Sequence, residues 1–303
     1  MDPLEDVLAL LETRAHLSTG LVAGGEWAVR FEAPSGVKFN AVRHGGCLLE
    51  VEGADGPVEL AAGDCFLLTQ ARPFVLRSAP GVAPVAAEPV FAAAEGGFAR
   101  VGRGDDVLLV GGRFSFGDRA RALLLDALPP VIHVPVGTAH AQTVGWALEQ
   151  IGQELLRRPV ASTLVAEHLA VVMLVHVLRL HLAEESHGVS GWPAGLSDPV
   201  VAPALAALHR APAHGWTVAE LARTSGVSRS TLAARFKRTV GCPPLDYLRR
   251  WRIELASQRL RKGTETLAVI ARAVGYGSES ALSTAFKEVT GSSPRAYRGG
   301  PVA

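Results

Sequence analysis

The last hundred residues contain one residue pattern twice, and this repeat constrains what the chain can fold into. The first copy runs through Val218–Gly226 and Ser228–Lys237, and the second runs through Ala268–Gly275 and Ser278–Lys287. Both copies then close on glycine, proline and tyrosine: Gly241, Pro244 and Tyr247 in the first, and Gly291, Pro294 and Tyr297 in the second. Matching positions lie 49 or 50 residues apart, and the one-residue difference falls in a turn. The repeat predicts two copies of one supersecondary unit.

Each copy has the residues of a helix-turn-helix. Gly226 and Gly275 each follow a short helical pattern, and a glycine at that point ends a helix because it accepts a positive φ. Ser228 and Ser278 then stand where the N-cap of a second helix is needed. Leucine and phenylalanine at positions i and i+4 predict the buried face of that second helix. These core residues are Leu232, Phe236, Leu282 and Phe286.

The opposite face of each second helix is small, polar or basic, which suits a helix lying in the major groove of DNA. The predicted base-facing residues are Arg229, Ser230, Ala233, Ala234 and Lys237 in the first unit and Glu279, Ser280, Ser283, Thr284 and Lys287 in the second. Arg229 has the donors to read a guanine, and Glu279 can accept from a cytosine amino group. Five further arginines are predicted to contact phosphates or, in part, to pair with nearby acids: Arg235, Arg238, Arg249, Arg250 and Arg252.

This segment resembles the DNA-binding domain of AraC/XylS-family transcription regulators over about residues 198–300. Besides the tandem units, Pro244–Ile253 resembles the family's joining helix, and Gly275-Tyr276 and Gly291–Arg298 resemble its second-unit signature. The resemblance implies a DNA-binding domain at 200–303, with helix-turn-helix units at about 217–238 and 266–288 and a joining helix at about 243–262. Many members carry an arginine where this chain has Thr284, so weaker DNA readout is expected from the second unit.

Charge is divided unevenly along the 303 residues. The net charge is only +1, but residues 200–303 hold 16 Lys and Arg against 6 Asp and Glu, and residues 1–199 hold 14 against 23. A basic part beside an acidic part is expected when a nucleic-acid-binding domain is joined to another domain. A solvated basic surface would give the same counts, and the repeat favours the first interpretation. Length and a hydrophobic fraction of 48% predict two packed domains.

The N-terminal part predicts a short helix at 4–14 and then a β-rich region at 21–135. The strand candidates are Val37–Val42, Cys47–Val51, Val58–Leu60, Cys65–Leu68, Phe74–Leu76 and Val107–Val110. Short strands separated by Gly-rich and Pro-rich turns indicate a sandwich or barrel. Leu60–Leu68, Gly111–Phe114 and Leu128–Val134 resemble the cupin-like half of many AraC-type regulators. The expected fold is therefore a two-domain α+β chain, with an N-terminal cupin-like β-barrel followed by helices and a C-terminal all-α domain.

Two helices are expected at 139–185, completing an N-terminal domain at 1–187. Along the second helix, one stripe is predicted to comprise Leu164, His168, Val171, Val175, Leu178 and Leu182. The stripe either packs on its own β domain or, as the family resemblance implies, forms a dimer interface. Gly-, Pro- and Ser-rich residues at 188–199 predict an interdomain linker. The apolar run from Leu169 to Leu178 is too short to span a bilayer, so no membrane partner is expected.

The cupin likeness raises the question of a metal, because cupin enzymes hold one with two or three histidines and a carboxylate. Here only His44, with Glu50 nearby, lies among the first strands, and His133 and His140 are isolated. Transition-metal sites need several converging ligands, so neither a metal nor another cofactor is expected. A barrel pocket for a small effector is the preferred interpretation. Arg43, His44 and Arg72 are the candidate residues for an acidic ligand.

Three cysteines, Cys47, Cys65 and Cys242, form no metal or disulfide pattern. Cys47 and Cys65 fall in the same predicted sheet, so a redox pair is one alternative. Burial as small hydrophobic residues is the stronger one. The acidic N-terminus lacks the basic start of a signal peptide, which together with the cysteine usage predicts a cytoplasmic protein.

The favoured hypothesis is a sequence-specific transcription regulator that is not an enzyme. Its two recognition helices would enter successive major grooves about 34 Å apart. The expected partners are double-stranded DNA, a small-molecule effector, a second copy of the chain and RNA polymerase. One alternative is a metal-dependent cupin enzyme or sensor fused to a DNA-binding module. Another is a repair protein that accepts alkyl groups on an activated cysteine and then regulates transcription.

Overall fold

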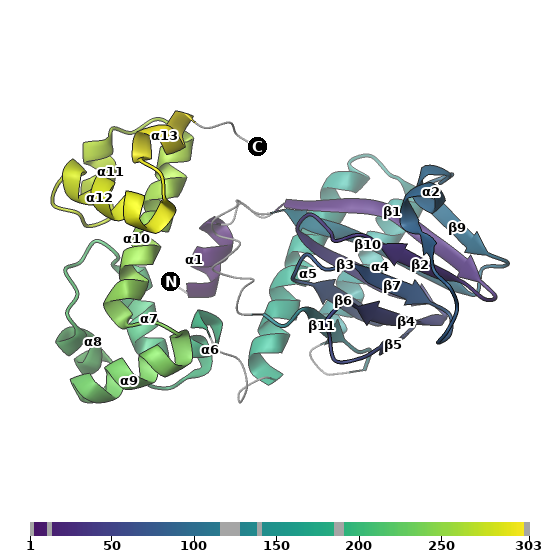
Figure 1. Cartoon of the computed structure of the whole chain (residues 1–303), viewed down its shortest axis with the longest axis horizontal. Helices are drawn as coiled ribbons and strands as arrows, with labels where there is room; N and C mark the ends of the chain where they lie inside the picture. The colour runs from purple at the N-terminus through teal and green to yellow at the C-terminus, as the bar shows by residue number, and fades with distance from the viewer. Residues whose placement is uncertain (1–2, 11–13, 116–127, 138–140, 185–190, 300–303) are drawn as a thin grey trace. The chain divides into compact units, whose positions relative to one another are not determined.

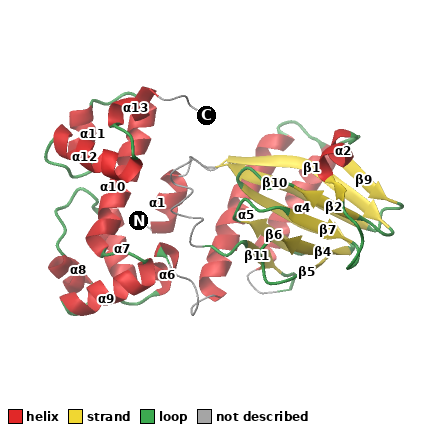
Figure 2. Ribbon diagram, in the orientation of Figure 1, coloured by secondary structure: helices red, strands yellow, loops and turns green. Residues whose placement is uncertain are grey.

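The computed structural model describes residues 3–10, 14–115, 128–137, 141–184 and 191–299. They form two compact units. One is β-rich and includes two long helices, and the other is entirely helical (Figure 2). The predicted fold class is therefore confirmed.

The β-rich unit is built from two sheets (Figure 1). The first has the order β11-β6-β3-β10-β1-β9, with β1 Arg14–Gly24, β3 Val37–His44, β6 Cys65–Leu68, β9 Phe98–Gly102, β10 Val107–Ser115 and β11 Val131–Val134. The second has the order β5-β4-β7-β2-β8, with β2 Ala28–Phe31, β4 Gly46–Val51, β5 Val58–Ala61, β7 Phe74–Arg77 and β8 Val85–Ala86. A short helix, α2 (Ala87–Ala92), follows β8.

The core of this unit lies between the two sheets. Leu21, Val42 and Leu109 of the first sheet pack with Leu49 and Leu76 of the second. The other face of the first sheet meets α5 (Ser162–Glu184), which contacts β1 and β11 and packs against α4 (Ala141–Arg157). All four residues of β6 are buried, as expected for a strand inside the domain.

The predicted strands are confirmed, although several are longer than expected. The prediction for the N-terminus is partly wrong. The helix expected at 4–14 is the shorter α1 (Pro3–Leu10). Arg14 already begins β1, so the β-rich region starts before residue 21. The register of β1 against β10 shifts between Ser18 and Leu21. Such an irregularity breaks the alternation by which a strand is recognised in sequence.

α5 differs from its predicted orientation. Leu164 and His168 of the predicted stripe are exposed, Val171 and Val175 are half-buried, and Leu178 is buried. The residues that pack inward are Ala166, Ala170, Met173, Leu174, Val177 and Leu178. By length and composition α5 could cross a membrane, but it is a packed helix of the β-rich unit. The first half of the predicted stripe therefore does not pack on its own domain.

The helical unit contains the tandem repeat. Its elements are α6 Trp192–Ser197, α7 Val201–Arg210, α8 Val218–Thr224, α9 Arg229–Val240, α10 Pro244–Lys262, α11 Leu267–Ala273, α12 Glu279–Thr290 and α13 Pro294–Gly299. The linker predicted at 188–199 is wrong over α6, which packs on α7 and α9 and buries Trp192 and Pro193. The Gly191 N–H also donates to the Thr239 carbonyl at 2.8 Å.

α1 belongs to the helical unit. Its Leu4 and Val7 are buried, and it contacts α7 and α10. The Asp6 carboxylate lies 3.3 Å from Nδ1 of His209, whose Nε2 is 2.7 Å from the Tyr247 hydroxyl. These first residues, which were expected in the N-terminal domain at 1–187, thus make their contacts with the helical unit.

Candidate nucleic-acid interface

The first helix-turn-helix is held by capping interactions at both of its helices. The Thr217 hydroxyl accepts from the Glu220 N–H at 3.2 Å, and the Glu220 carboxylate accepts from the Thr217 N–H at 2.8 Å. This capping box starts α8. Gly226 then has a φ of 66°, and the Ser228 hydroxyl accepts from the Thr231 N–H at 3.1 Å to start α9. The predicted glycine and serine roles are confirmed.

The second unit repeats this construction. The Thr266 hydroxyl accepts from the Val269 N–H at 3.4 Å, and the Ser278 hydroxyl accepts from the Ala281 N–H at 3.1 Å. Gly275 has a φ of 90°, and a Cβ there would lie 2.7 Å from the Cα of Ala213. Gly275 is thus required both by its conformation and by the close approach of another backbone segment.

Packing fixes the orientation of both second helices. Leu232 and Phe236 of α9, and Leu282 and Phe286 of α12, have no exposed side-chain surface. The repeated tyrosines explain part of this packing, because Tyr247 meets Phe236 edge-on at 5.9 Å and Tyr297 meets Phe286 edge-on at 5.3 Å. Since one face of each helix is committed to the core, the other face is set outward.

The outward faces carry the predicted base-facing residues. Arg229, Ser230, Ala234 and Lys237 are exposed on α9, and Ala233 is half-buried. On α12 the exposed residues are Glu279, Ser280, Thr284 and Lys287, and Ser283 is half-buried at the position equivalent to Ala233. The two units therefore present equivalent surfaces, and their contact with bases stays a prediction.

Three of the five predicted phosphate-binding arginines are engaged within the helical unit. Arg235 Nε donates to both carboxylate oxygens of Asp198, at 3.1 and 2.8 Å. Arg249 pairs with Glu288. Arg252 donates to the carbonyls of Pro212 and His214 at 2.7 and 2.8 Å, and its guanidinium lies over the Tyr276 ring. These contacts tie helices together.

Arg238 and Arg250 are exposed and make no hydrogen bond or ion pair within the described chain. Sequence reasoning missed a second pair, Arg223 at the end of α8 and Arg272 at the end of α11. These two occupy equivalent positions of the repeat, both are exposed, and the first helix of a helix-turn-helix crosses the DNA backbone. Comparing the two copies position by position could have found them.

Two of the three residues proposed for a barrel pocket are engaged with other groups of the fold. Arg43 pairs with Glu149 of α4, and its hydrogen bond is the main reason that the pKa of Glu149 is lowered. Arg72 donates to the carbonyls of Glu52 and Gly53 at 3.2 and 2.8 Å. His44 is exposed at the end of β3.

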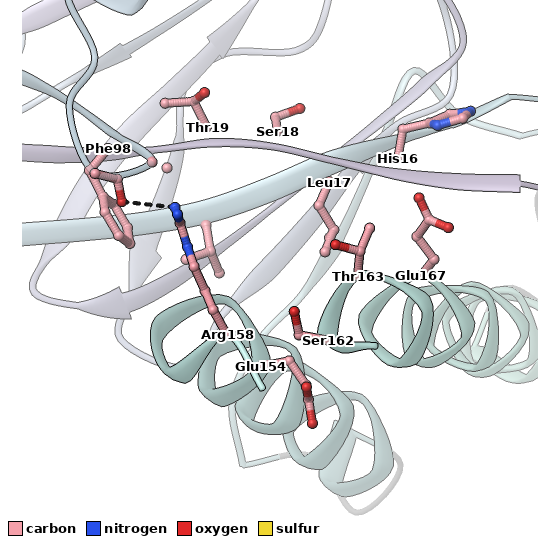
Figure 3. A pocket seen from close by; sticks show the side chains of 14 residues that line it. His16, Leu17, Ser18, Thr19, Phe98, Glu154, Arg158, Ser162, Thr163 and Glu167 are labelled. Atoms are coloured by element: carbon pink, nitrogen blue, oxygen red, sulfur yellow. Dashed lines mark hydrogen bonds between the residues drawn. The ribbon is translucent and has the colours of Figure 1, made fainter. Parts of the chain in front are cut away.

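A cavity lies elsewhere in the β-rich unit, between β1 and the turn that joins α4 to α5 (Figure 3). Its volume is about 440 Å³, and its edge includes Gly96, Gly97 and Phe98. Among the described residues, no three His, Cys, Asp or Glu side chains gather as a metal site. His133 instead lies 3.1 Å from Asp64.

The cysteines lie in unreactive surroundings. Cys47 is in β4 and Cys65 in β6, so their assignment to one sheet is wrong. Both are buried, and burial raises the pKa of each thiol to about 12. Burial also raises the pKa of the half-buried Cys242. Because the thiolate is the nucleophile, these environments disfavour an alkyl-accepting or redox-active cysteine.

Comparison with known proteins agrees with this arrangement. A cupin family matches residues 2–183, and a helix-turn-helix domain family matches residues 221–300. The chain is 68% identical over 99% of both chains to an AraC-like transcription regulator of Streptomyces lividans, and 65% identical over the full length of both chains to one of Streptomyces antibioticus. The regulator AlkR of Acinetobacter baylyi is 34% identical over 58% of each chain. The chain therefore belongs to the AraC-like transcription regulators, with a cupin N-terminal domain and a helix-turn-helix DNA-binding domain.

Proposed function

We propose that this regulator recognises its operator through the outward faces of α9 and α12, which enter successive major grooves. The observation that carries the proposal is the equivalence of the two exposed faces, each fixed by a buried leucine and phenylalanine. Arg229 and Lys237 are the strongest base-reading candidates, because each offers exposed donors on the outward face of α9. Arg223, Arg238, Arg250 and Arg272 supply phosphate contacts.

Operator binding can be tested by selecting genomic fragments with the purified full-length protein and then measuring affinity at several salt concentrations. Arg229→Ala should weaken binding about tenfold and relax the preferred sequence, since one bidentate base contact is worth roughly 1–3 kcal/mol. Arg272→Ala should weaken all sequences alike and reduce the salt slope by about one. Arg100→Ala, on the exposed edge of β9, is the matched control. Unchanged affinity and sequence preference in Arg229→Ala and Lys237→Ala would show that the DNA-facing surface is misassigned.

The N-terminal domain is proposed to bind a small effector and a second copy of the chain. Leu164, Val165 and Val172 are exposed on α5, and an exposed apolar surface of this kind marks an interaction site. In this scheme the protein works in the cytoplasm as a homodimer that is not an enzyme. Contact with RNA polymerase would follow where the operator lies beside a promoter.

A further inference from the structure

Three basic side chains lie in one row across the first sheet. His16 of β1 is paired in register with Arg113 of β10, and Arg113 is paired with Lys38 of β3. These three residues are the basic row. The next residue across the sheet is Leu68 of β6, which belongs to the core between the sheets, so the basic row lies on the face turned toward the second sheet. Figure 3 agrees, because His16 points away from α5 and Leu17 points toward it.

The basic row has no carboxylate partner among the residues that the structure describes. The hydrogen-bond partners of its members are serine hydroxyls: Ser115 for His16 at 3.0 Å, Ser18 for Lys38 at 3.3 Å and Ser35 for Arg113 at 2.8 Å. Carboxylates are not scarce in this part of the chain, because residues 1–199 hold 23 Asp and Glu against 14 Lys and Arg. The arginines of the same unit that do pair with glutamates are Arg30, Arg43 and Arg77. The basic row is therefore uncompensated positive charge in an acidic domain.

This arrangement costs stability, because like charges directly opposite one another on neighbouring strands repel. Lys38 is half-buried, and burial together with the charge of Arg113 lowers the pKa of Lys38 to about 8. The ammonium is therefore still mostly protonated at pH 7. A cation held in such surroundings without a counter-ion is stabilised when an anion binds beside it.

A neutral hydrogen-bonding group beside the basic row is also unused. Asn40 lies two residues along β3 from Lys38, so it is on the same face of the sheet, and it is only 7% exposed. Its side-chain amide makes no hydrogen bond with any described residue. This amide lies over Gly111 of β10, where a Cβ would collide with Oδ1 of Asn40. Because buried amides are nearly always hydrogen-bonded, this one indicates that a ligand group binds beside it.

We propose that the basic row, together with Ser18 and Asn40, binds the oxyanion of a small-molecule effector, a carboxylate or a phosphate. Lys38 and Arg113 supply the positive charge, and charge-assisted hydrogen bonds to an oxyanion are the strong ones. Ser18 accepts from Lys38, so its own O–H can donate to the anion, as can the Asn40 amide. Arg113 is exposed, so the anion reaches the basic row from solvent. This inference rests on the proposed function, because it names the ligand chemistry of the effector domain.

The test uses benzoate and benzamide, which share one body and differ in charge, with inorganic phosphate as the second oxyanion. In isothermal titration of the full-length protein at pH 7, at least one oxyanion should bind saturably and roughly tenfold or more tightly than benzamide. Tighter benzoate assigns the site to an organic acid, and tighter phosphate assigns it to a phosphorylated effector. Lys38→Met and Arg113→Met should each weaken that oxyanion about tenfold, corresponding to roughly 1.4 kcal/mol. Arg100→Met, exposed on β9, is the control and should bind as the parent does.

Benzamide affinity equal to that of the oxyanions, unchanged oxyanion affinity in Lys38→Met, or no saturable heat from either oxyanion would overturn the inference. Thermal unfolding of each variant establishes that lost binding is not lost folding. Operator binding is measured on the same proteins without probes. Specific operator binding with no oxyanion binding would reject the basic row as an effector site and leave the proposed DNA recognition standing, and oxyanion binding without operator recognition would do the reverse.

Discussion

The ion pair between Asp198 and Arg235 gives Arg235 a structural role where the sequence predicts a phosphate contact. Burial by itself would raise the pKa of the Asp198 carboxyl, but the hydrogen bond from Arg235 and those from the Val200 and Val201 N–H groups together lower it. This carboxylate therefore links the end of α6, the start of α7 and the side of α9. Arg235 serves the fold of the helical unit, although its sequence neighbourhood suggested a phosphate contact.

Replacing Asp198 with Asn should lower the free energy of unfolding of the helical unit by about 1 kcal/mol at pH 7. Because the folded pKa lies below the unfolded value near 4, this contribution is present at neutral pH and is lost as the pH falls through the folded pKa. Denaturant titrations of parent and Asp198→Asn from pH 7 downward should therefore converge in acid. Asp105→Asn, on an exposed loop, should match the parent, and a parent-like Asp198→Asn at pH 7 would contradict the assigned role.

A second residue-scale prediction concerns Lys38. Strand register places His16, Arg113 and Lys38 directly opposite one another on three neighbouring strands. Lys38 donates to the Ser18 hydroxyl at 3.3 Å, and burial together with the charge of Arg113 lowers the pKa of Lys38 to about 8. An unfolded lysine titrates near 10.5, so keeping this ammonium charged costs stability at neutral pH, and the cost falls as the pH rises from about 8.

Lys38→Met should therefore stabilise the β-rich unit by about 2 kcal/mol at pH 7, since each pKa unit corresponds to roughly 1.4 kcal/mol and part of the gain is lost to repacking. The advantage over the parent should shrink between pH 8 and 10. Thermal and denaturant unfolding across this pH range measure the stability difference between the variant and the parent. Arg100→Met, at an exposed position of β9, is the control. A destabilised Lys38→Met at pH 7 would mean that the ammonium makes a favourable contact in the fold.

At the scale of elements, a helix can be predicted when the residues that specify it lie close together in the sequence. α8, α9, α11 and α12 could be predicted because serine caps, positive-φ glycines and buried Leu–Phe pairs lie within a few residues of one another. α5 could not be oriented, because apolar residues occur on every side of it, and burial is decided by β1, β11 and α4. The partners of Arg43 and Arg252 were equally hidden, since Glu149 lies 106 residues from Arg43 and Pro212 lies 40 residues from Arg252.

The exposed surface of α5 gives an element-scale prediction. For the proposed dimer, Leu164→Glu and Val172→Glu should shift the protein to monomer, because each places a charge in the proposed apolar contact between copies. Both side chains are exposed, at 57% and 41%, so the stability of the β-rich unit should change by less than about 0.5 kcal/mol. Sedimentation measures the association state. Gln142→Glu, exposed on α4, is the control, and a parent that sediments as a monomer would reject this interface.

At the scale of the whole molecule, the domain boundaries were the least predictable feature. Composition predicts a linker at 188–199, but Trp192 and Pro193 are buried in the helical unit. The sequence of a short apolar helix does not indicate which surface it covers, so position along the chain predicts that the first ten residues belong to the N-terminal domain. Only the folded arrangement of α7 and α10 supplies the apolar site for Leu4 and Val7.

Disrupting α1 should destabilise the helical unit, whose other helices lie about 190 residues later in the sequence. Leu4→Asp should lower the free energy of unfolding of the helical unit by about 2–3 kcal/mol, because it places a charge at a buried apolar position. The β-rich unit should unfold as in the parent. Native-state hydrogen exchange measures the protection of each unit separately. Glu5→Asp, on the exposed side of α1, is the control. Loss of protection confined to the β-rich unit would show that α1 covers another surface.

The position of α1 means that the polypeptide leaves the helical unit at its beginning and returns to it at its end. A single proteolytic cut between residues 185 and 190 would therefore not yield two independent domains. The N-terminal fragment would keep Leu4, Val7 and Asp6, which bind the other fragment through α7 and α10. The two pieces should copurify as a nicked protein, and a helical fragment expressed from residue 191 alone should recover stability when a peptide of residues 1–12 is added in trans.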